Sequence, residues 1–399
     1  MLTIEKIDTT STKQVNRFVN LPYRLYAGHA QWVPPLLGDA KLYLNRHKHF
    51  FYQHSEADFF IAARDGRDVG RIAMLDHRRF NDYHGTHQAQ FYLFDCEDDQ
   101  EVAAALFAQA FAWAKNRGLT KIIGPKGFGT LDPFGVLVEG FEHRQMMTMS
   151  NYNYPYYQTL VEAAGFSKEV DFSSFYLDAQ TLRLPAWIRR TAELARQKGE
   201  LQVQSFETLP QGGLLWLALL LHQLNLNLGF SAVRAGLSRL RQGIEIYNQS
   251  MVKNWEYYPL SPVEITAMIN DLKWIINPSL PKIITYQDEV VGVLLALPDV
   301  SAPLQRAQGR LTPWATLDLL KTIRRPQWIV LAGFGILPQF RLQGGPALIL
   351  AELEKTVIQA GVQHVELHQV ADTAAQVGRD LETVGLKPYK KHRVYVRTL

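Results

Sequence analysis

The chain has 399 residues, of which 47% are hydrophobic and 20% are charged, so its composition predicts a globular protein of two or three domains. The formal net charge of +4 is too small to favour nucleic acid as a partner, and the single cysteine, Cys96, excludes an intrachain disulfide and a thiolate metal site. The opening stretch MLTIEKIDTT has no apolar signal segment, and we therefore expect a cytoplasmic protein.

A regular pattern begins after a lead-in, residues 1–50, that is irregular and contains helix. It predicts a hairpin, a third strand, a helix, a parallel return strand, a second helix and a closing strand, at Asp58–Arg64, Val69–Asp76, Gln90–Phe94, Asp98–Arg117, Lys121–Gly124, Pro155–Ala164 and Phe172–Leu177. Gly118 is placed to end the first helix as a C-cap glycine.

The middle of the chain is expected to be mostly helical. The pattern indicates a helix, a short strand and a longer helix at Ala186–Lys198, Leu201–Phe206 and residues 232–253. The apolar stretch Leu214–Leu228 lies between the last two. It is too short and carries too many amide and imidazole groups to span a bilayer, which needs about 20 apolar residues. We expect it to be buried between domains or in a homodimer contact, with a surface contact to a membrane as the alternative.

The first series of elements then recurs. A hairpin, strand, helix, strand, helix and closing strand are predicted at Lys282–Gln287, Val290–Leu297, Trp328–Ile336, Pro346–Ala360, His364–Val370, Thr373–Val384 and His392–Arg397. Because each helix between two strands acts as a crossover, the sheets should contain parallel pairs. The sequence thus predicts an α/β protein with mixed sheets, built from two tandem domains, residues 1–178 and 179–399.

The motif Gly335-Ile-Leu-Pro-Gln-Phe-Arg-Leu-Gln-Gly-Gly-Pro-Ala347 resembles the cofactor loop of the GCN5-related N-acetyltransferases. That family has Gln/Arg-x-x-Gly-x-Gly/Ala after its fourth strand. Arg341 takes the first position and Gly344 the second, whereas Pro346 stands where Gly or Ala is usual. The resemblance extends over residues 55–178 and 200–399, through Val69-Gly-Arg-Ile, Leu160-Val-Glu-Ala-Ala-Gly-Phe166 and the closing helix, glycine and strand.

This resemblance implies an acyl-coenzyme A, such as acetyl-coenzyme A, bound by the second domain. A glycine-rich turn that opens a helix binds phosphate through backbone N–H groups and the helix dipole, and an arginine adds a charged bond. The expected cofactor residues are Gly335, Ile336, Arg341, Leu342, Gln343, Gly344, Gly345 and Ala347. The alternative is a plain strand–helix turn with proline at the first helical position.

The corresponding stretch of the first domain, Asp95–Gln100, has no glycine and four carboxylates. Acidic side chains at a helix N-terminus satisfy the dipole themselves and repel a pyrophosphate. We therefore expect no coenzyme A in the first domain.

Proton chemistry is expected from the second domain. The family often places a tyrosine acid on its last helix, but this chain has Asp380 there, and Tyr389 or Tyr395 could substitute. His364, Glu366 and His368 alternate along a strand and should share one face, so Glu366 or His368 is a candidate base. A solvated sheet face is the alternative, and no metal site is expected.

A substrate site is expected where amphipathic side chains gather. Asn151, Tyr154, Tyr156 and Tyr157 follow a long connection in the first domain, and Trp255 lies in the second. They indicate either a cleft between the domains or a packed seam.

The expected function is acyl-coenzyme A-dependent N-acyl transfer to a small-molecule or peptide amine. The departures at Pro346 and Asp380 leave open a non-catalytic, ligand-sensing or interaction protein on the same scaffold.

Overall fold

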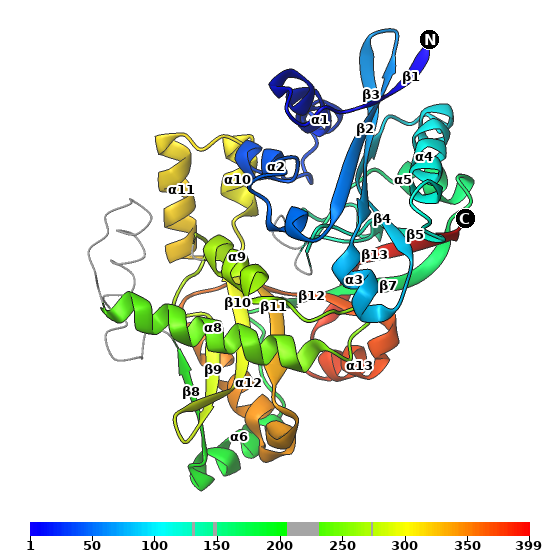
Figure 1. Ribbon diagram of the computed structural model, residues 1–399. Coiled ribbons are helices and arrows are strands. Elements are labelled where there is room, and N and C mark those ends of the chain that lie inside the picture. The colour runs from blue at the N-terminus through cyan, green and yellow to red at the C-terminus, as the bar shows by residue number, and fades with distance from the viewer. Residues whose placement is uncertain (130–131, 147–149, 206–230, 273) are drawn as a thin grey trace.

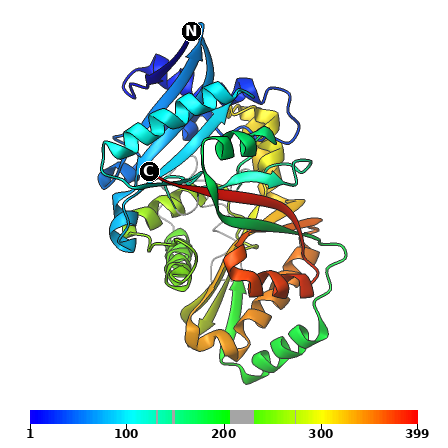
Figure 2. The ribbon, with the colours of Figure 1, turned by 90° about the vertical axis from the view of Figure 1, so that its right-hand side faces the viewer.

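The structure is a computed structural model that describes residues 1–129, 132–146, 150–205, 231–272 and 274–399. The expected apolar helix Leu214–Leu228 lies outside these residues. We call residues 1–178 the first copy and residues 179–399 the second copy. The views in Figures 1 and 2 show the copies as two lobes, one above the other, joined by long strands.

The first copy follows the predicted order, with additional elements in the lead-in, between β3 and β4, and in the long connection between β5 and α5. Its strands are β1 (Leu2–Lys6), β2 (Glu56–Arg64), β3 (Arg67–Asp76), β4 (Gln88–Cys96), β5 (Lys121–Gly124), β6 (Val136–Glu139) and β7 (Ser167–Asp178). Its helices are α1 (Thr12–Leu25), α2 (Leu37–Leu42), η1 (Phe50–Gln53), α3 (Arg78–His84), α4 (Gln100–Lys115) and α5 (Tyr156–Ala163).

The second copy repeats this order and adds a helical hairpin, α10–α11, between two of its strands. Its strands are β8 (Leu201–Ser205), β9 (Lys282–Tyr286), β10 (Glu289–Pro298), β11 (Trp328–Ile336), β12 (His364–Ala371) and β13 (Lys387–Thr398). Its helices are α6 (Ala186–Lys198), α8 (Ser231–Met251), α9 (Pro262–Leu272), α10 (Ser301–Ala307), α11 (Pro313–Arg324), η2 (Pro338–Gln343), α12 (Gly345–Gln359), η3 (Asp372–Ala374) and α13 (Ala375–Thr383).

The described strands form one continuous sheet in the order β1-β2-β3-β4-β5-β13-β7-β12-β11-β10-β9-β8, with β6 on β13. The two closing strands are exchanged between the copies. β13 of the second copy pairs with β5, where Tyr395 faces Gly124, and β7 of the first copy pairs with β12, where Tyr176 faces Glu366. Figure 2 shows β13 in red beside β7 in green between the lobes.

This exchange corrects the expectation that each closing strand completes its own copy. The order of elements along the chain was predicted correctly, but a pattern of apolar residues does not say which strand edge a closing strand will join. β7 and β13 have 12 residues each and pair antiparallel with one another over most of their length. The order of elements along the chain therefore repeats after residue 178, but the sheet is continuous through both copies.

Each lobe buries apolar side chains on both faces of the sheet. In the first copy α4 and α5 cover one face, and α1 and η1 cover the other. In the second copy α6 and α12 cover one face, and α8 and α9 cover the other. Helix α4 begins at an acidic N-cap, Asp99, and α9 begins at a capping box of Ser261 and Glu264.

Candidate active site

Two neighbouring strands of the second copy separate at their carboxyl ends. β11 and β12 pair in parallel from Trp328–His364 to Leu331–Leu367, and the paired register ends there. β11 continues beside β10 as far as Ile336, with a β-bulge that leaves Ala332 out of the register. A bulged residue is unpaired in the hydrogen-bond ladder. Its backbone groups can therefore bind a ligand at the splay, the place where β11 and β12 separate.

The N-terminus of α12 follows β11 after the short 3-10 helix η2. Gly344 adopts the left-handed conformation with φ of 85°, and α12 starts at Gly345 with no acidic residue in its first turn. The first N–H groups of a helix lack intrahelical partners, so Gly345 and Ala347 offer donors, while Pro346 offers none. Arg341 is exposed, and its Nε donates to the Ile336 carbonyl at 3.4 Å, so its charge lies beside the turn.

These residues fit a phosphate group. The two glycines, however, are required by packing inside the protein and not only by the approach of a ligand. A Cβ on Gly344 would stand 2.7 Å from Cβ of Ala195 on α6, and a Cβ on Gly345 would stand 2.6 Å from Cδ1 of Ile336. Packing within the chain thus requires both glycines, whether or not a ligand approaches. Of the other expected cofactor residues, Gly335 is buried beneath α8, whereas Leu342 and Gln343 point to solvent.

The corresponding turn of the first copy is already filled by the chain's own charges. The Asp99 carboxylate accepts hydrogen bonds from the N–H groups of Glu101 and Val102. Arg64 in turn pairs with Asp99 and Glu101, at 2.5 Å each. A phosphate would meet carboxylates here, which supports the expectation that the first copy binds no coenzyme A.

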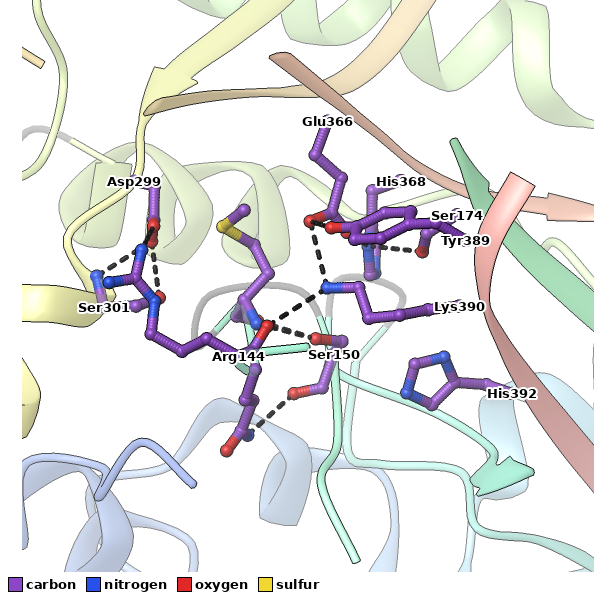
Figure 3. Close-up of polar contacts among 12 residues, drawn as sticks. Arg144, Ser150, Ser174, Asp299, Ser301, Glu366, His368, Tyr389, Lys390 and His392 are labelled. Carbon is purple, nitrogen blue, oxygen red and sulfur yellow. Dashed lines mark hydrogen bonds and ion pairs between the residues drawn. The ribbon is translucent and has the colours of Figure 1, made fainter. Parts of the chain in front are cut away.

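A buried ionic cluster lies at the last paired positions before the splay (Figure 3). Glu366 is fully buried and accepts hydrogen bonds from Lys390 Nζ at 3.0 Å and from the Tyr389 hydroxyl. His368 Nδ1 lies 3.4 Å from Glu366 Oε1, so the two side chains share one face as predicted. The candidate base and the candidate tyrosine acid are therefore in direct contact.

The electrostatics of this cluster correct one expectation. Burial by itself would raise the pKa of Glu366, but the Lys390 ammonium, His368 and Tyr389 together lower that pKa to about 2. Glu366 therefore stays ionised near neutral pH and is a weak base. Burial and the neighbouring Glu366 charge raise the pKa of Tyr389 far above its ordinary value, so its phenol stays protonated.

His392 lies on the same face of β13 as Lys390, two positions along, and is fully buried. Its Nε2 is 2.9 Å from the Asn151 carbonyl. Because a carbonyl only accepts, Nε2 carries the proton and Nδ1 carries the lone pair. Nδ1 has no hydrogen-bond partner among the described residues, and burial lowers the pKa of His392 to about 3. His392 is thus a neutral imidazole with an available lone pair.

The first copy closes over this cluster through the end of its long connection. The Arg144 carbonyl is 3.4 Å from Lys390 Nζ, and the Arg144 guanidinium pairs with buried Asp299 at 2.5 Å. Asp299 follows β10 and also accepts from the backbone N–H of Ser301 at 2.8 Å. Burial raises the pKa of Asp299, and the Arg144 charge opposes that rise. The cluster is therefore assembled from both copies.

The sequence did not single out Lys390, His392, Arg144 or Asp299. A signal was present for the first two, because Lys390 and His392 are two residues apart at the start of the closing strand and therefore share one face. No local pattern marks Arg144 or Asp299, which meet only through the tertiary fold.

The three tyrosines expected at a substrate cleft lie elsewhere. Tyr154, Tyr156 and Tyr157 pack with the core of the first copy, and their hydroxyls donate to carbonyl oxygens or join a buried network around Asp95. Their ring faces stack on neighbouring aromatic rings, which explains the clustering without a substrate. Of the expected substrate residues, Asn151 does reach the site, through its carbonyl on His392.

Trp255 lies at the seam between the copies. Its ring packs against Phe172 at 5.5 Å and near Lys126 Nζ at 5.2 Å. Lys126 also pairs with Glu256 at 2.6 Å, which ties the first copy to the second. The contacts of Trp255 among the described residues are those of a packed seam.

The described part of the chain has neither a cluster of metal ligands nor a membrane-spanning helix. No group of three or more His, Cys, Asp or Glu residues there is placed to hold a metal ion. Within the same residues, no helix combines the length and the apolar character that a membrane crossing requires.

The fold is that of a tandem GCN5-related N-acetyltransferase. A tandem protein of this class from the clavulanic acid biosynthesis pathway superposes with a TM-score of 0.55 at 11% identity, over 100% of this chain and 98% of that one. A glucosamine N-acetyltransferase region of a fungal multi-domain β-N-acetylglucosaminidase gives 0.53 at 12% identity, over 100% of this chain and 38% of that one. No family model matches the sequence.

Two curated proteins are similar over nearly the whole chain. A bacterial ceramide synthase of Caulobacter vibrioides is 27% identical over 98% of this chain and 97% of its own length. Protein YghO of Escherichia coli is 24% identical over 96% of this chain and 92% of its own length. Both alignments extend over both copies.

Proposed function

We propose that the protein is an N-acyltransferase that joins the acyl group of an acyl-coenzyme A to the amine of a long-chain amino alcohol. The position of the Glu366 cluster carries this proposal. It lies where β11 and β12 begin to separate, on the strand next to the one that leads to the helix N-terminus of Gly345. A site for phosphate and a buried ionic cluster are thus connected by one pair of strands.

The second copy would hold the coenzyme, because its helix N-terminus is free of acidic side chains. Arg341 and the N–H groups of Gly345 and Ala347 would bind the phosphates. When bound, an acyl-coenzyme A supplies the acyl group as a thioester, which an amine can attack. The shared chemistry of the fold does not select acetyl over longer acyl groups.

The acceptor class is inferred from the similarity to a ceramide synthase along almost all of the chain. A ceramide is a long-chain amino alcohol whose amine carries a fatty acyl amide. Glu366 accepts three hydrogen bonds in the cluster and is fully buried, so it fixes Tyr389 and Lys390 in position rather than contacting the acceptor itself.

Neither Glu366 nor His392 is a strong base near neutral pH, because the pKa of Glu366 is about 2 and that of His392 is about 3. An amine that forms an amide must lose a proton, and we assign that proton to solvent water, which also protonates the departing thiolate. Glu366 remains charged and holds Tyr389 and Lys390 in place.

A thiol-release assay with purified full-length protein tests the proposal. Acetyl-coenzyme A and a C16 acyl-coenzyme A are each supplied with a long-chain 2-amino-1,3-diol, with glucosamine, or with a peptide amine. We expect thiol release to depend on the long-chain amino alcohol and an amide product to appear in equal amount. Equal release with all three acceptors would contradict the acceptor class.

A ligand-sensing protein without catalysis is the second candidate. The internal packing reasons for Gly344 and Gly345, together with Pro346, favour it. Calorimetric binding of coenzyme A without thiol release for any acceptor would support this candidate.

A further inference from the structure

The helical hairpin α10–α11 is inserted between the two strands that lead into the site. It begins at Asp299 and Ser301, directly after β10, and returns to β11 at Trp328. Its inner face is buried, because Leu304 and Ile323 pack against Val33 of the first copy. Its backbone is also fixed, since the Leu37 N–H donates to the Gly309 carbonyl at 3.0 Å. The hairpin is therefore a rigid extension of the site (Figure 1).

The opposite face of α11 is apolar at one end and basic at the other. Trp314, Leu317, Lys321 and Arg324 follow one another at intervals of three or four residues, so they share one face of the helix. We call these four residues the α11 stripe. Trp314 is 79% exposed and Leu317 is 56% exposed. Leu311, which precedes the helix, is also 56% exposed. Large apolar side chains grouped in this way mark an interaction surface.

The charge of the hairpin is equally uneven. Residues 301–325 contain five basic side chains and one acidic one, which gives a formal charge of +4, equal to that of the entire chain. The five basic residues are Arg306, Arg310, Lys321, Arg324 and Arg325. The acid, Asp318, is paired with Arg306 at 2.8 Å. The hairpin that carries Trp314 and Leu317 therefore has an excess of positive charge.

We propose that the α11 stripe docks the protein on the surface of an anionic lipid bilayer. Tryptophan and leucine insert at the level of the headgroups, and lysine and arginine bind lipid phosphates, so the combination matches a charged lipid surface. The protein lies on the membrane without spanning it. The hairpin that carries the stripe begins next to Asp299, which pairs with Arg144 at the site.

Vesicle flotation of the full-length chain tests this docking. Vesicles contain either phosphatidylcholine alone or phosphatidylcholine with 30 mol% phosphatidylglycerol. We expect binding to the anionic vesicles, with weak binding to the neutral ones and loss of binding at high salt. Equal binding to both compositions, or binding to neither, would overturn the proposal.

Two variants locate the surface. Trp314→Ala with Leu317→Ala should lower the partition coefficient by about tenfold or more, because it removes the inserted side chains. Lys321→Gln with Arg324→Gln should lower it by about tenfold at low salt and much less at high salt.

Helix α6 supplies a matched control, since it also exposes a tryptophan and a leucine beside arginines: Trp187 is 61% exposed and Leu194 is 53% exposed. Trp187→Ala with Leu194→Ala should leave binding within about twofold, and an equal loss in this control would overturn the assignment to α11. Far-ultraviolet circular dichroism on the same samples confirms that each variant is folded. The vesicle result is independent of turnover, so a failure of the proposed function would be seen separately.

Discussion

His392 is held neutral because its ring is buried and its Nε2–H is committed to the Asn151 carbonyl. Its pKa falls from 6.5 in the unfolded chain to about 3 in the fold. The unfolded chain therefore binds more protons than the folded one between these values. The contribution to stability is complete above pH 6.5 and is lost as the pH falls toward 3.

We expect the free energy of unfolding to decrease by about 2 kcal/mol between pH 7 and pH 5 from this one side chain. His392→Asn keeps a donor for the carbonyl but does not titrate, so its stability should change less over this range. Urea unfolding of both proteins at the two pH values measures the difference. An identical pH slope in the variant would show that His392 is not a buried neutral ring.

Glu366 should affect turnover more than its neighbour His364 on the same strand. Glu366→Gln removes the charge that holds Lys390 and Tyr389 in position, so we expect turnover to fall by about 100-fold with coenzyme A affinity nearly unchanged. His364 contacts Tyr176 and Trp328 outside the cluster. His364→Gln is the matched control, and steady-state rates over pH 6–9 test both. Full turnover in Glu366→Gln would refute the role of Glu366.

At the scale of single elements, the N-termini of α4 and α12 decide which copy binds coenzyme A. We expect one coenzyme A per chain, because Asp99 and Glu101 oppose a phosphate in the first copy. Arg341→Ala should weaken binding by about 1.5–3 kcal/mol through loss of a charged hydrogen bond. Calorimetry checks both the affinity and the stoichiometry.

Arg379→Ala on α13 is the control for Arg341→Ala. Arg379 is exposed and bonds to Gln376 in its own helix, so its removal should leave coenzyme A affinity unchanged. Two equivalent sites per chain, or equal losses in the two variants, would refute the assignment of the cofactor to α12.

The elements themselves were largely predictable, because they depend on local periodicity and on caps. The strands β2, β3, β10 and β11 and the helices α4 and α12 lie close to their predicted ranges. Glu366 and Tyr389 could be chosen as candidates from the sequence, because the strand pattern and the resemblance limit where proton chemistry can occur. Arg144 and Asp299 could not be chosen in this way, because they are 155 residues apart and no local rule relates them. The same limit applies to the exchanged strands.

At the scale of the whole molecule, the exchange of β7 and β13 links the stability of the two copies. A fragment of residues 1–178 lacks the strand that pairs with β5, and a fragment of residues 179–399 lacks the strand that pairs with β12. We expect neither fragment to unfold cooperatively alone, and co-expression to restore a complex with the intact chain's far-ultraviolet circular dichroism. A cooperative thermal transition in the isolated first fragment would contradict this.

Because β13 is at the end of the chain, the sheet of the first copy is completed only late in synthesis. The ribosome makes β5 at residues 121–124 but reaches β13 only at residues 387–398. At about 5–20 residues per second, that interval lasts roughly 13 to 53 seconds. Until then the nascent first copy presents β5 as an open strand edge, which can pair with other chains. Slower translation of the second copy should therefore increase aggregation, and the nascent chain is a candidate client for chaperones that shield strand edges.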